Sequence, residues 1–428
     1  MRTRGQPAHR TTTAHIQSAY PFVAEGGLGG RGVYIGRDVY GGSFCYDPWQ
    51  LYGRELTSPN AVVVGIVGRA KSSLVKTYVF RQAVFGRQAW IVDVKGEYDR
   101  LAHALGVTPI NVAPGGTVRL NPLTPRGGPE RQLNLLYSVA AAALERPLSP
   151  EEKRAGQEAL HVLQRRSRSE QTLPDVVEVL IHPPAEMADA LSMSTAEIAH
   201  AVRPMAFALD QLCTGNLQGM FDGPTSPGLD LDAPLVVLNL RAVLNTHTTA
   251  LGILMTCATA WLQAVIEAET DERNTRRIVV IDEAWRIFSN LGIGEWLQQS
   301  FKLSRGLGTQ NIVVMHRLSD LRAAGHAGSR EVKLAEGLLA DAETKIIYAQ
   351  PADQLPQTRE LLGLTDTEAE LLPQLRRGWA LWKVGQRSFL VQHRLSPYEQ
   401  GLVDTDARMT VKGNGFPAAQ AVPAGTRA

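Results

Sequence analysis

The sequence predicts an α/β protein whose core is a parallel, doubly wound sheet with an all-α insertion. Two observations predict the sheet: a phosphate-loop motif follows a buried apolar run at 62–64, and a second such run at 278–281 ends in two adjacent acids. A third predicts the insertion, because strand patterns vanish between 127 and 228 and helical patterns follow one another there. Strands that alternate with helices favour a parallel sheet whose ligand lies at the carboxyl ends of the strands.

The phosphate loop departs from its template at one position. The template G-x-x-x-x-G-K-[ST] is matched at Gly65, Lys71 and Ser72, whereas Ala70 stands where the second glycine is expected. Apolar residues with helical spacing follow from Leu74 onward, so the loop lies between a strand and a helix. An alanine tolerates the tight curl of such a loop only if its φ is negative; otherwise Ala70 strains the loop. The alternative is a tight strand-to-helix turn in which Lys-Ser occurs by chance.

The loop predicts a site for ATP and Mg²⁺. In such a loop successive backbone N–H groups point at the phosphate oxygens, and the helix adds the partial positive charge of its N-terminus. Lys71 would contact the terminal phosphates, and the Ser72 hydroxyl would ligate the magnesium ion that bridges them. We expect nucleotide contacts from the residues of the loop: Gly65, Gly68, Arg69, Ala70, Lys71, Ser72 and Ser73.

A second motif supplies the acids that nucleotide hydrolysis requires. The run 277–281 is typical of a parallel strand buried on both faces, and Asp282 and Glu283 follow it directly. At the carboxyl end of such a strand, Asp282 would hold Mg²⁺ through its water, and Glu283 would polarise the attacking water as the catalytic base. Alone, the run is also compatible with a buried strand capped by solvated acids. Together with the phosphate loop, it favours nucleotide hydrolysis.

Length and composition exclude several classes of protein. With 428 residues, 44% hydrophobic and 20% charged, the chain has the composition of an ordinary globular protein, and we expect two packed units, or one unit with a large insertion. The net charge, 44 minus 42 or +2, provides no general basic field for nucleic acid, although a local basic patch is compatible with it. The three cysteines, Cys45, Cys213 and Cys257, lie far apart, which argues against a disulfide framework or a zinc cluster and for a reducing compartment.

Taken in order, the chain divides into five segments. We expect a flexible arm at 1–31, a first part of the core at 32–126 that opens with a β-hairpin, the all-α insertion at 127–228, a second part of the core at 229–411 and a disordered tail at 412–428. The N-terminus carries no apolar stretch that could serve as a signal peptide.

Two acids follow a second buried strand, which is expected at 89–94 in the first part of the core. Asp93 ends this strand and Glu97 follows it, so both belong to the edge of the sheet that carries the phosphate loop. Either is a candidate for contact with the attacking water or with a neighbouring subunit. Solvated loop acids are the alternative, and the commoner fate of such residues.

Helical patterns are clear in the insertion and recur in the second part of the core. Ser149, followed by proline and two acids, is a typical N-cap for one of these helices. The helices of the insertion are expected at 133–144, 150–163, 173–181 and 195–212. The apolar stretch 251–268 is broken by Gln263 and closed by Glu267, which favours a buried helix over a membrane span.

The strand after the acidic one ends in a polar residue. A helix is expected at 295–303 and a strand at 311–316, so His316 would lie at a strand tip next to the γ-phosphate, where enzymes of this kind sense hydrolysis. A plain loop histidine is the alternative. Later strands are expected at 344–350, 379–384 and 388–393.

Several further stretches accompany the phosphate loop: Asp93–Tyr98, Leu120–Leu123, Gly219–Gly223, Ile281–Trp285, Arg317–Leu321 and Asp404–Met409. In combination they resemble the motor domain of the conjugative, or type IV secretion, ATPases of the TraC and TrbE kind, within the HerA and FtsK superfamily. The resemblance extends from about Gly32 to Met409 and is much more specific than any single motif.

The resemblance implies a RecA-like P-loop NTPase core with an all-α insertion, assembled as a homo-hexamer that uses ATP and Mg²⁺. It assigns the phosphate and magnesium positions to Lys71 and Ser72, and the metal and catalytic acids to Asp282 and Glu283. Arg305 falls where the family has an arginine finger, which completes the active site of a neighbouring subunit; an ordinary exposed arginine near a helix C-terminus is the alternative. The departures are Ala70 and His316, which stands where the family usually has glutamine.

Three functions are compatible with the sequence. The first is a cytoplasmic ATPase, peripheral at the inner face of the membrane and without a transmembrane segment of its own, that drives conjugative DNA or protein transfer through secretion-channel proteins. The second is a DNA translocase of the FtsK or HerA kind, against which the near-neutral charge and the lack of a recognisable DNA-binding winged helix count. The third is a nucleotide-binding scaffold that does not hydrolyse, which requires that Ala70 deform the loop.

Overall fold

The computed structural model of the chain describes residues 27–123, 128–166, 170–215, 217–230, 233–244, 254, 275–284, 297–298, 300–316, 318 and 330–403. Several sequence predictions therefore lie outside the described residues: most of the arm 1–31, most of the helix at 251–268, most of the stretch 317–321, and the chain from 404 on, which includes the tail at 412–428.

The described residues form one sheet. Its strands are β1 (Val33–Asp38), β2 (Ser43–Tyr46), β3 (Ala61–Val64), β4 (Gln88–Asp93), β5 (Ile110–Asn111), β6 (Leu235–Asn239), β7 (Arg277–Ile281), β8 (Thr309–Met315), β9 (Thr344–Ile347), β10 (Trp379–Val384) and β11 (Arg387–His393). Their order is β2-β1-β11-β10-β9-β3-β8-β7-β4-β6-β5. From β9 to β5 neighbouring strands are parallel, and the pairs on the other side of β9 are antiparallel.

The parallel strands are buried on both faces, as their continuous apolar sequences predict. In β3, Val62 and Val64 belong to the hydrophobic cluster that also contains the insertion, whereas Val63 belongs to the cluster on the opposite face. This alternation follows from the two-residue period of a strand. The sheet thus has a packed layer on each side.

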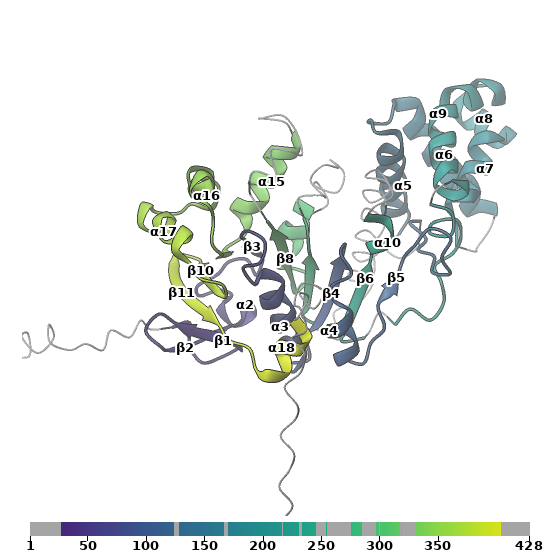
Figure 1. The fold of residues 1–428 in the computed structure, drawn as a ribbon. Coiled ribbons are helices and arrows are strands. Elements are labelled where there is room, and N and C mark those ends of the chain that lie inside the picture. The colour runs from purple at the N-terminus through teal and green to yellow at the C-terminus, as the bar shows by residue number, and fades with distance from the viewer. Residues whose placement is uncertain are drawn as a thin grey trace, which may run out of the picture.

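The helices cover the sheet or form the insertion. They are α2 (Pro48–Leu51), α3 (Lys71–Ala83), α4 (Asp99–Ala104), α5 (Pro129–Leu144), α6 (Pro150–Arg166), α7 (Leu173–Ile181), α8 (Ala185–Leu191), α9 (Thr195–Thr214), α10 (Arg241–Leu244), α15 (Arg330–Asp341), α16 (Leu355–Leu362), α17 (Asp366–Leu371) and α18 (Pro397–Val403), with short 3-10 turns at Ala352–Gln354 and Leu372–Gln374. Helices α5 to α9 pack on one another and stand beyond the β5 end of the sheet (Figure 1).

The structure confirms the predicted fold class, a mixed α/β core with a mostly parallel sheet. The strands expected around the phosphate loop, at 89–94 and before the two acids are present with shifts of one or two residues at their ends, and α7 has the predicted bounds. Helix α8 was not predicted. No described helix combines the length and the apolar character that crossing a bilayer requires.

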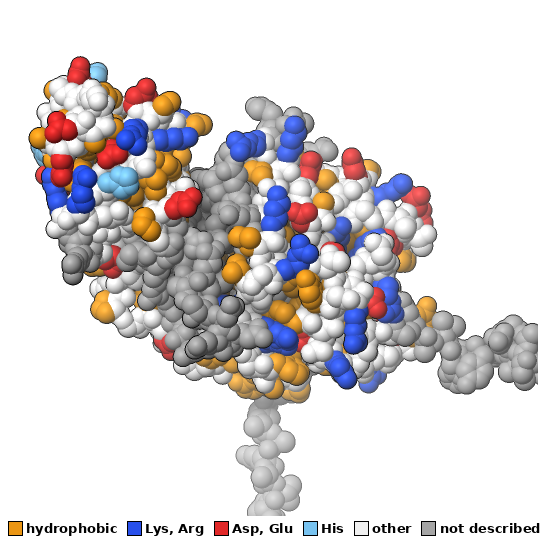
Figure 2. All heavy atoms as spheres, turned by 180° about the vertical axis from the view of Figure 1, so that it is seen from behind, with side chains coloured by type: hydrophobic (Ala, Val, Ile, Leu, Met, Phe, Trp, Pro, Cys, Tyr) orange, Lys and Arg blue, Asp and Glu red, His pale blue; other side chains and the backbone are white. Residues whose placement is uncertain are grey.

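Charges are mixed on the surface. Figure 2 shows Lys and Arg side chains interspersed with Asp and Glu both on the helical segment and on the sheet-containing part, among the side chains that the structure describes on this face. This agrees with a net charge of only +2. Electrostatics alone therefore do not single out this face as a surface for nucleic acid.

Candidate nucleotide site

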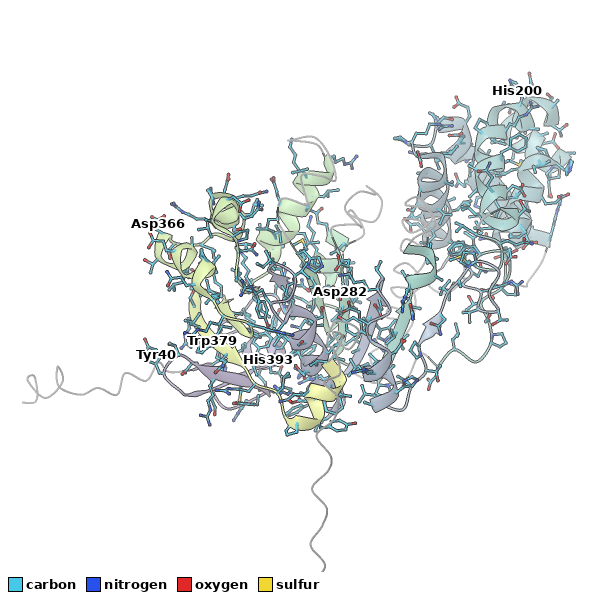
Figure 3. The ribbon with its side chains drawn as sticks, in the orientation of Figure 1. Tyr40, His200, Asp282, Asp366, Trp379 and His393 are labelled. Carbon is cyan, nitrogen blue, oxygen red and sulfur yellow. The ribbon has the colours of Figure 1, made fainter. Side chains whose placement is uncertain are left out.

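Four neighbouring strand ends carry the predicted site. The strand order β3-β8-β7-β4 places the phosphate loop after β3, His316 after β8, Asp282 and Glu283 after β7, and Asp93 at the end of β4. Because these strands are parallel, all four carboxyl ends lie at the same edge of the sheet. Figure 3 shows Asp282 in the middle of the sheet-containing part, with His200 of the helical segment at the far end of the molecule.

The phosphate loop curls as a glycine-rich loop does, although one glycine is an alanine. A Cβ atom at Gly65 would lie 2.4 Å from the Cβ atom of Tyr348, so this glycine is required by the close approach of β9. Gly68 has φ +80° and Ala70 has φ +81°. The condition for an unstrained alanine, a negative φ, is therefore not met: the loop takes the left-handed conformation at Ala70, with alanine in the place of glycine.

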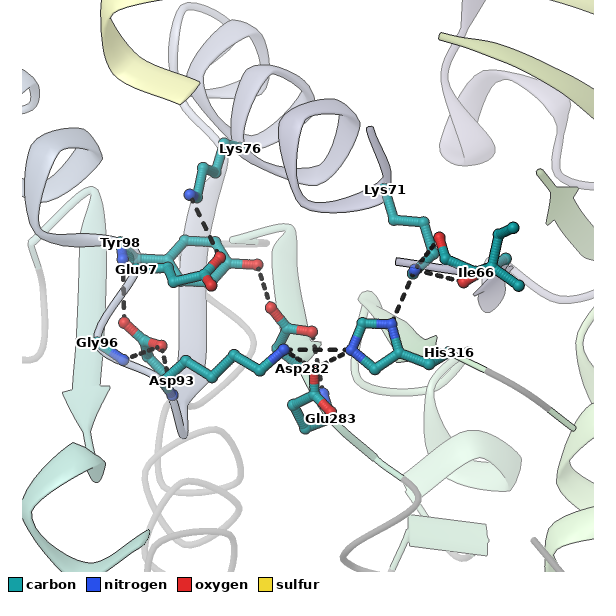
Figure 4. Close-up of polar contacts among 12 residues, drawn as sticks. Ile66, Lys71, Lys76, Asp93, Gly96, Glu97, Tyr98, Asp282, Glu283 and His316 are labelled. Atoms are coloured by element: carbon teal, nitrogen blue, oxygen red, sulfur yellow. Dashed lines mark hydrogen bonds and ion pairs between the residues drawn. The ribbon is translucent and has the colours of Figure 1, made fainter. Parts of the chain in front are cut away.

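Lys71 begins α3 and turns back over the loop. Its Nζ atom donates to the carbonyl oxygens of Gly65 and Ile66, the latter at 3.0 Å, and lies 2.9 Å from His316 Nδ1 (Figure 4). Burial lowers the pKa of Lys71 to about 8, against the opposing effect of the Asp282 and Glu283 charges. Lys71 is thus a buried cation at the place where the sequence predicts phosphate.

The other predicted loop residues surround this lysine. Ser72 and Ser73 are half-buried in the first turn of α3. Arg69 is directed away from the loop, since its Nη1 atom donates to the Leu375 carbonyl at 3.4 Å and its own carbonyl accepts from Gly378. This arginine ties the loop to the turn before β10.

Asp282 is buried and held by two hydrogen bonds. The Tyr98 hydroxyl donates to its Oδ2 atom at 3.2 Å, and the backbone N–H of Glu283 donates to Oδ1 at 2.9 Å. Burial, followed by the neighbouring Glu283 charge, raises the pKa of Asp282 to about 6. A nearby cation would stabilise the ionised form of this buried carboxylate.

Glu283 lies between the tips of β8 and β4. Its Oε1 atom accepts from His316 Nε2 and from Lys95 Nζ, and its backbone has φ +56°, which is uncommon for a residue other than glycine. A line of contacts therefore runs from Lys71 through His316 to Glu283 (Figure 4). The structure brings together Lys71, Asp282, Glu283 and His316, as the sequence predicted.

Asp93 has a different role from those considered in the sequence. It is only 1% exposed, and its carboxylate accepts from the backbone N–H groups of Lys95, Gly96 and Tyr98 at 3.2, 2.8 and 3.0 Å. The expectation of a solvated loop acid is wrong for Asp93, because these bonds use its oxygens to fix the loop after β4. Glu97 is paired with the buried Lys76 at 3.8 Å.

Arg305 is not part of this cluster. It is exposed in the turn that precedes β8, at the amino end of that strand, whereas the phosphate loop is at the carboxyl edge. Arg305 therefore cannot serve the site of its own chain without a large rearrangement. A catalytic role for Arg305 would therefore be at the site of a neighbouring molecule; the alternative is that it has no catalytic role.

The donor set fits a nucleotide with magnesium. Within the described residues no group of three or more His, Cys, Asp or Glu side chains could hold a metal ion. Magnesium bound to a nucleotide needs fewer, since one or two protein oxygens, phosphate oxygens and water complete its shell. The Asp282 carboxylate and the Ser72 hydroxyl are oxygen ligands of the required kind.

Lys95 and Tyr98 are members of the site that were not predicted from the sequence. Both lie in the stretch after β4 in which only the acids were considered, yet Lys95 contacts Glu283 and Tyr98 contacts Asp282. The available signal was a cation and a hydroxyl group directly after a buried strand. What the sequence did not contain was the adjacency of β4 to β7, which brings them to the acids.

Comparisons with known proteins give similar structures but no similar sequences. No protein-family model and no curated protein matches the chain. VirB4 of Thermoanaerobacter pseudethanolicus is similar with a TM-score of 0.73 and 21% identity, over 88% of this chain and 100% of that one. The plasmid coupling protein TrwB, in complex with ADP and Mg²⁺, is similar with a TM-score of 0.55 and 16% identity, over 86% and 91%. TrwB in complex with the ATP analogue ADPNP is similar with a TM-score of 0.54 and 15% identity, over 79% of this chain and 86% of that one.

At these identities the likeness concerns the fold. The similarity covers most of the chain, 88% of it for VirB4 and 86% for TrwB with ADP and Mg²⁺. The chain thus has the RecA-like P-loop NTPase fold of VirB4 and TrwB.

Proposed function

We propose that the chain is a motor ATPase of the conjugation or type IV secretion kind, which couples ATP hydrolysis to the transfer of DNA or protein through a membrane channel. One observation carries the proposal: Lys71, Asp282, Glu283 and His316 converge beside a phosphate loop at the carboxyl edge of the sheet. The fold shared with VirB4 and with the bacterial conjugative coupling protein TrwB supports the assignment to transfer.

Each residue has a role that its surroundings support. Lys71 leaves the loop carbonyls and His316 to contact the terminal phosphates of ATP. Glu283 accepts a proton from the attacking water, and His316, in contact with both Lys71 and Glu283, reports whether phosphate is present. Bound Mg²⁺, held by Asp282 and Ser72, would neutralise charge on the phosphates.

The assembly is a homo-hexamer in this proposal. An exposed arginine at the amino edge of the sheet can stabilise transition-state charge only at the site of another subunit, and Arg305 has that position. The chain would act at the cytoplasmic face of the membrane, bound to the proteins of the channel. DNA is a possible substrate rather than a required ligand.

The purified chain tests the proposal. We expect ATP hydrolysis that depends on Mg²⁺, and Lys71→Ala should lower ATP binding and turnover together, because the cation for the phosphates is lost. Lys153→Met, an exposed lysine of α6, is the matched control and should change neither. Absence of hydrolysis under conditions in which ATP binds would instead support a scaffold that does not hydrolyse.

Membrane partners and DNA separate the remaining functions. A secretion motor should co-purify with channel proteins after cross-linking in cells, and the Lys71→Ala protein should still do so. Hydrolysis that requires double-stranded DNA, with no membrane partner captured, would favour a DNA translocase and contradict the transfer function.

A further inference from the structure

We propose that Lys95 is a positioning residue that holds the catalytic carboxylate of Glu283 for hydrolysis. The inference rests on the proposed ATPase function, and it gives a role in hydrolysis to a cation from the loop after β4. Nothing in the phosphate-loop or acidic motifs requires a lysine at this place.

The contacts follow the order of the strands. Lys71 follows β3, His316 follows β8, Glu283 follows β7 and Lys95 follows β4, and these strands lie side by side in that order. Lys71 Nζ lies 2.9 Å from His316 Nδ1, and Glu283 Oε1 contacts both His316 Nε2 and Lys95 Nζ. Glu283 is therefore held between a group on each neighbouring strand.

The hydrogen-bond chemistry assigns each donor. An ammonium group only donates, so His316 Nδ1 accepts a hydrogen bond from Lys71. In the neutral ring the hydrogen is then on Nε2, which donates a hydrogen bond to Glu283. Lys95 Nζ is 3.2 Å from the same Nε2 atom, but both are donors, so Glu283 is the partner of Lys95. The carboxylate thus receives two charge-assisted or polarised donors, which fix its orientation.

Because Glu283 is buried, its ion pair with Lys95 matters for its charge. The Glu283 side chain is 4% exposed and follows directly on Asp282, a second buried acid. Two other charged groups lie near the pair. Lys71 from α3 interacts electrostatically with Glu283, and Glu97 from the loop after β4 interacts electrostatically with Lys95. Two adjacent buried acids need a counter-charge, and Lys95 supplies one in direct contact.

The loop that carries Lys95 is built to hold it still. Asp93 accepts from the backbone N–H groups of Lys95 and Gly96, and Gly96 has φ +71°. A Cβ atom at Gly96 would lie 2.9 Å from Arg241 Cδ, so the turn is closely packed. The backbone of Lys95 is therefore fixed, and its ammonium group has a defined reach to Glu283.

Kinetics of Lys95 variants test the positioning role. Lys95→Met should lower kcat about 10- to 100-fold, a part of the full effect of the base, while the KM for ATP stays within about twofold. Lys95→Arg should recover much of the loss, because it restores a cation at this place. A rise in KM with kcat unchanged would mean that Lys95 contacts phosphate, and would overturn the inference.

A stability cycle tests the ion pair without any turnover. In the nucleotide-free wild type, Glu283→Gln should lower Tm, because Lys95 loses its partner. In the Lys95→Met background the same Glu283→Gln change should raise Tm, because a buried acid without its cation is removed. The same sign in both backgrounds would overturn the inference. Lys153→Met serves as the control background. In it, Glu283→Gln should lower Tm, as it does in the wild type.

The two proposals fail in different ways. Wild-type protein that binds ATP without any turnover would overturn the ATPase function and the role of Lys95 with it. Normal wild-type turnover that Lys95→Met leaves unchanged would overturn the role of Lys95 alone.

Discussion

Ala70 occupies the left-handed region of backbone space in a loop whose shape is set by its neighbours. Its φ of +81° is nearly that of Gly68 in the same loop, so the loop keeps its curl and the alanine is strained. An unstrained alanine would have negative φ at this position. Local preference was overruled, because the strand before the loop and the helix after it fix where the chain must turn.

We therefore expect Ala70→Gly to stabilise the protein by about 1 kcal/mol, since glycine adopts this φ without the Cβ clash. Urea unfolding measures the change. Ala208→Gly, in the interior of α9, is the matched control and should destabilise by about 1 kcal/mol, because glycine is unfavourable in a helix. If both variants lose stability, Ala70 is not strained.

Asp282 is a second residue whose burial has a measurable effect. Its pKa of about 6 exceeds the ordinary 3.8 by about 2 units, which corresponds to about 3 kcal/mol. The folded protein holds this proton to higher pH than the unfolded chain does. The free energy of unfolding from this group therefore falls as pH rises from about 4 to about 6, and stays lowered above that.

Asp282→Asn should accordingly raise the stability of the metal-free protein at pH 8 by about 2 kcal/mol, after about 1 kcal/mol is subtracted for one lost hydrogen bond. The gain should be smaller at pH 5, where Asp282 is largely protonated. Thermal unfolding at the two values of pH measures it. The variant should also lose the extra stabilisation that Mg²⁺ gives in the presence of ATP. Equal gains at both pH values would contradict the buried-charge account.

At the scale of elements, the parts with strong local signals were predicted well. Helix α6 begins where Ser149 was expected as N-cap, and the Ser149 hydroxyl accepts from the Glu152 N–H at 3.2 Å. The apolar strands β3 and β7 were equally clear. Short elements such as α8 and β5 were missed, because a few residues carry too little periodicity to be distinguished from loop.

The turn that carries Arg305 is held by a buried polar network that the sequence did not indicate. Asn60, directly before β3, donates to the Phe301 carbonyl at 2.9 Å and to Ser304 Oγ at 3.0 Å, and accepts from the Asn311 backbone and side chain at 3.1 Å. These partners all come from the segment 301–311, which is far from Asn60 in the chain. The network fixes the turn relative to the strand that leads to the phosphate loop.

Asn60→Leu should destabilise the protein by about 2 to 4 kcal/mol, because several buried polar groups lose their partner at once. Chemical denaturation gives the value. The matched control is Asn134→Leu on the exposed face of α5, which should stay within about 0.5 kcal/mol of wild type. A loss of less than about 1 kcal/mol at Asn60 would show that water replaces the network.

For the whole molecule, the sequence was sufficient for the fold and for the residues that motifs mark, and insufficient for contacts between strand ends. Lys71, Asp282 and Glu283 could be predicted because each follows a strand in a recognisable pattern. Lys95 and Tyr98 could not be placed at the acids, because the sequence of a single strand does not indicate which strands lie beside it in the sheet. Antiparallel strands at one side of the sheet add to the predicted parallel core.

Assembly is tested by mixing two inactive variants. Arg305→Ala should lower turnover by about three orders of magnitude and leave ATP binding intact, if the arginine acts at a neighbouring site. Mixed with Glu283→Gln protein, it should regain part of the activity, because some interfaces then pair an intact acid with an intact arginine. Mixtures that co-assemble without recovery would show that Arg305 is an ordinary surface residue.

Comparing the turnover of Glu283→Gln with its ATP affinity tests directly whether Glu283 is the base for ATP hydrolysis. We expect ATP and Mg²⁺ to bind as in wild type, while steady-state hydrolysis falls by about two to four orders of magnitude, because the positioned base is lost. Turnover close to the wild-type rate, with ATP bound at the same site, would contradict it.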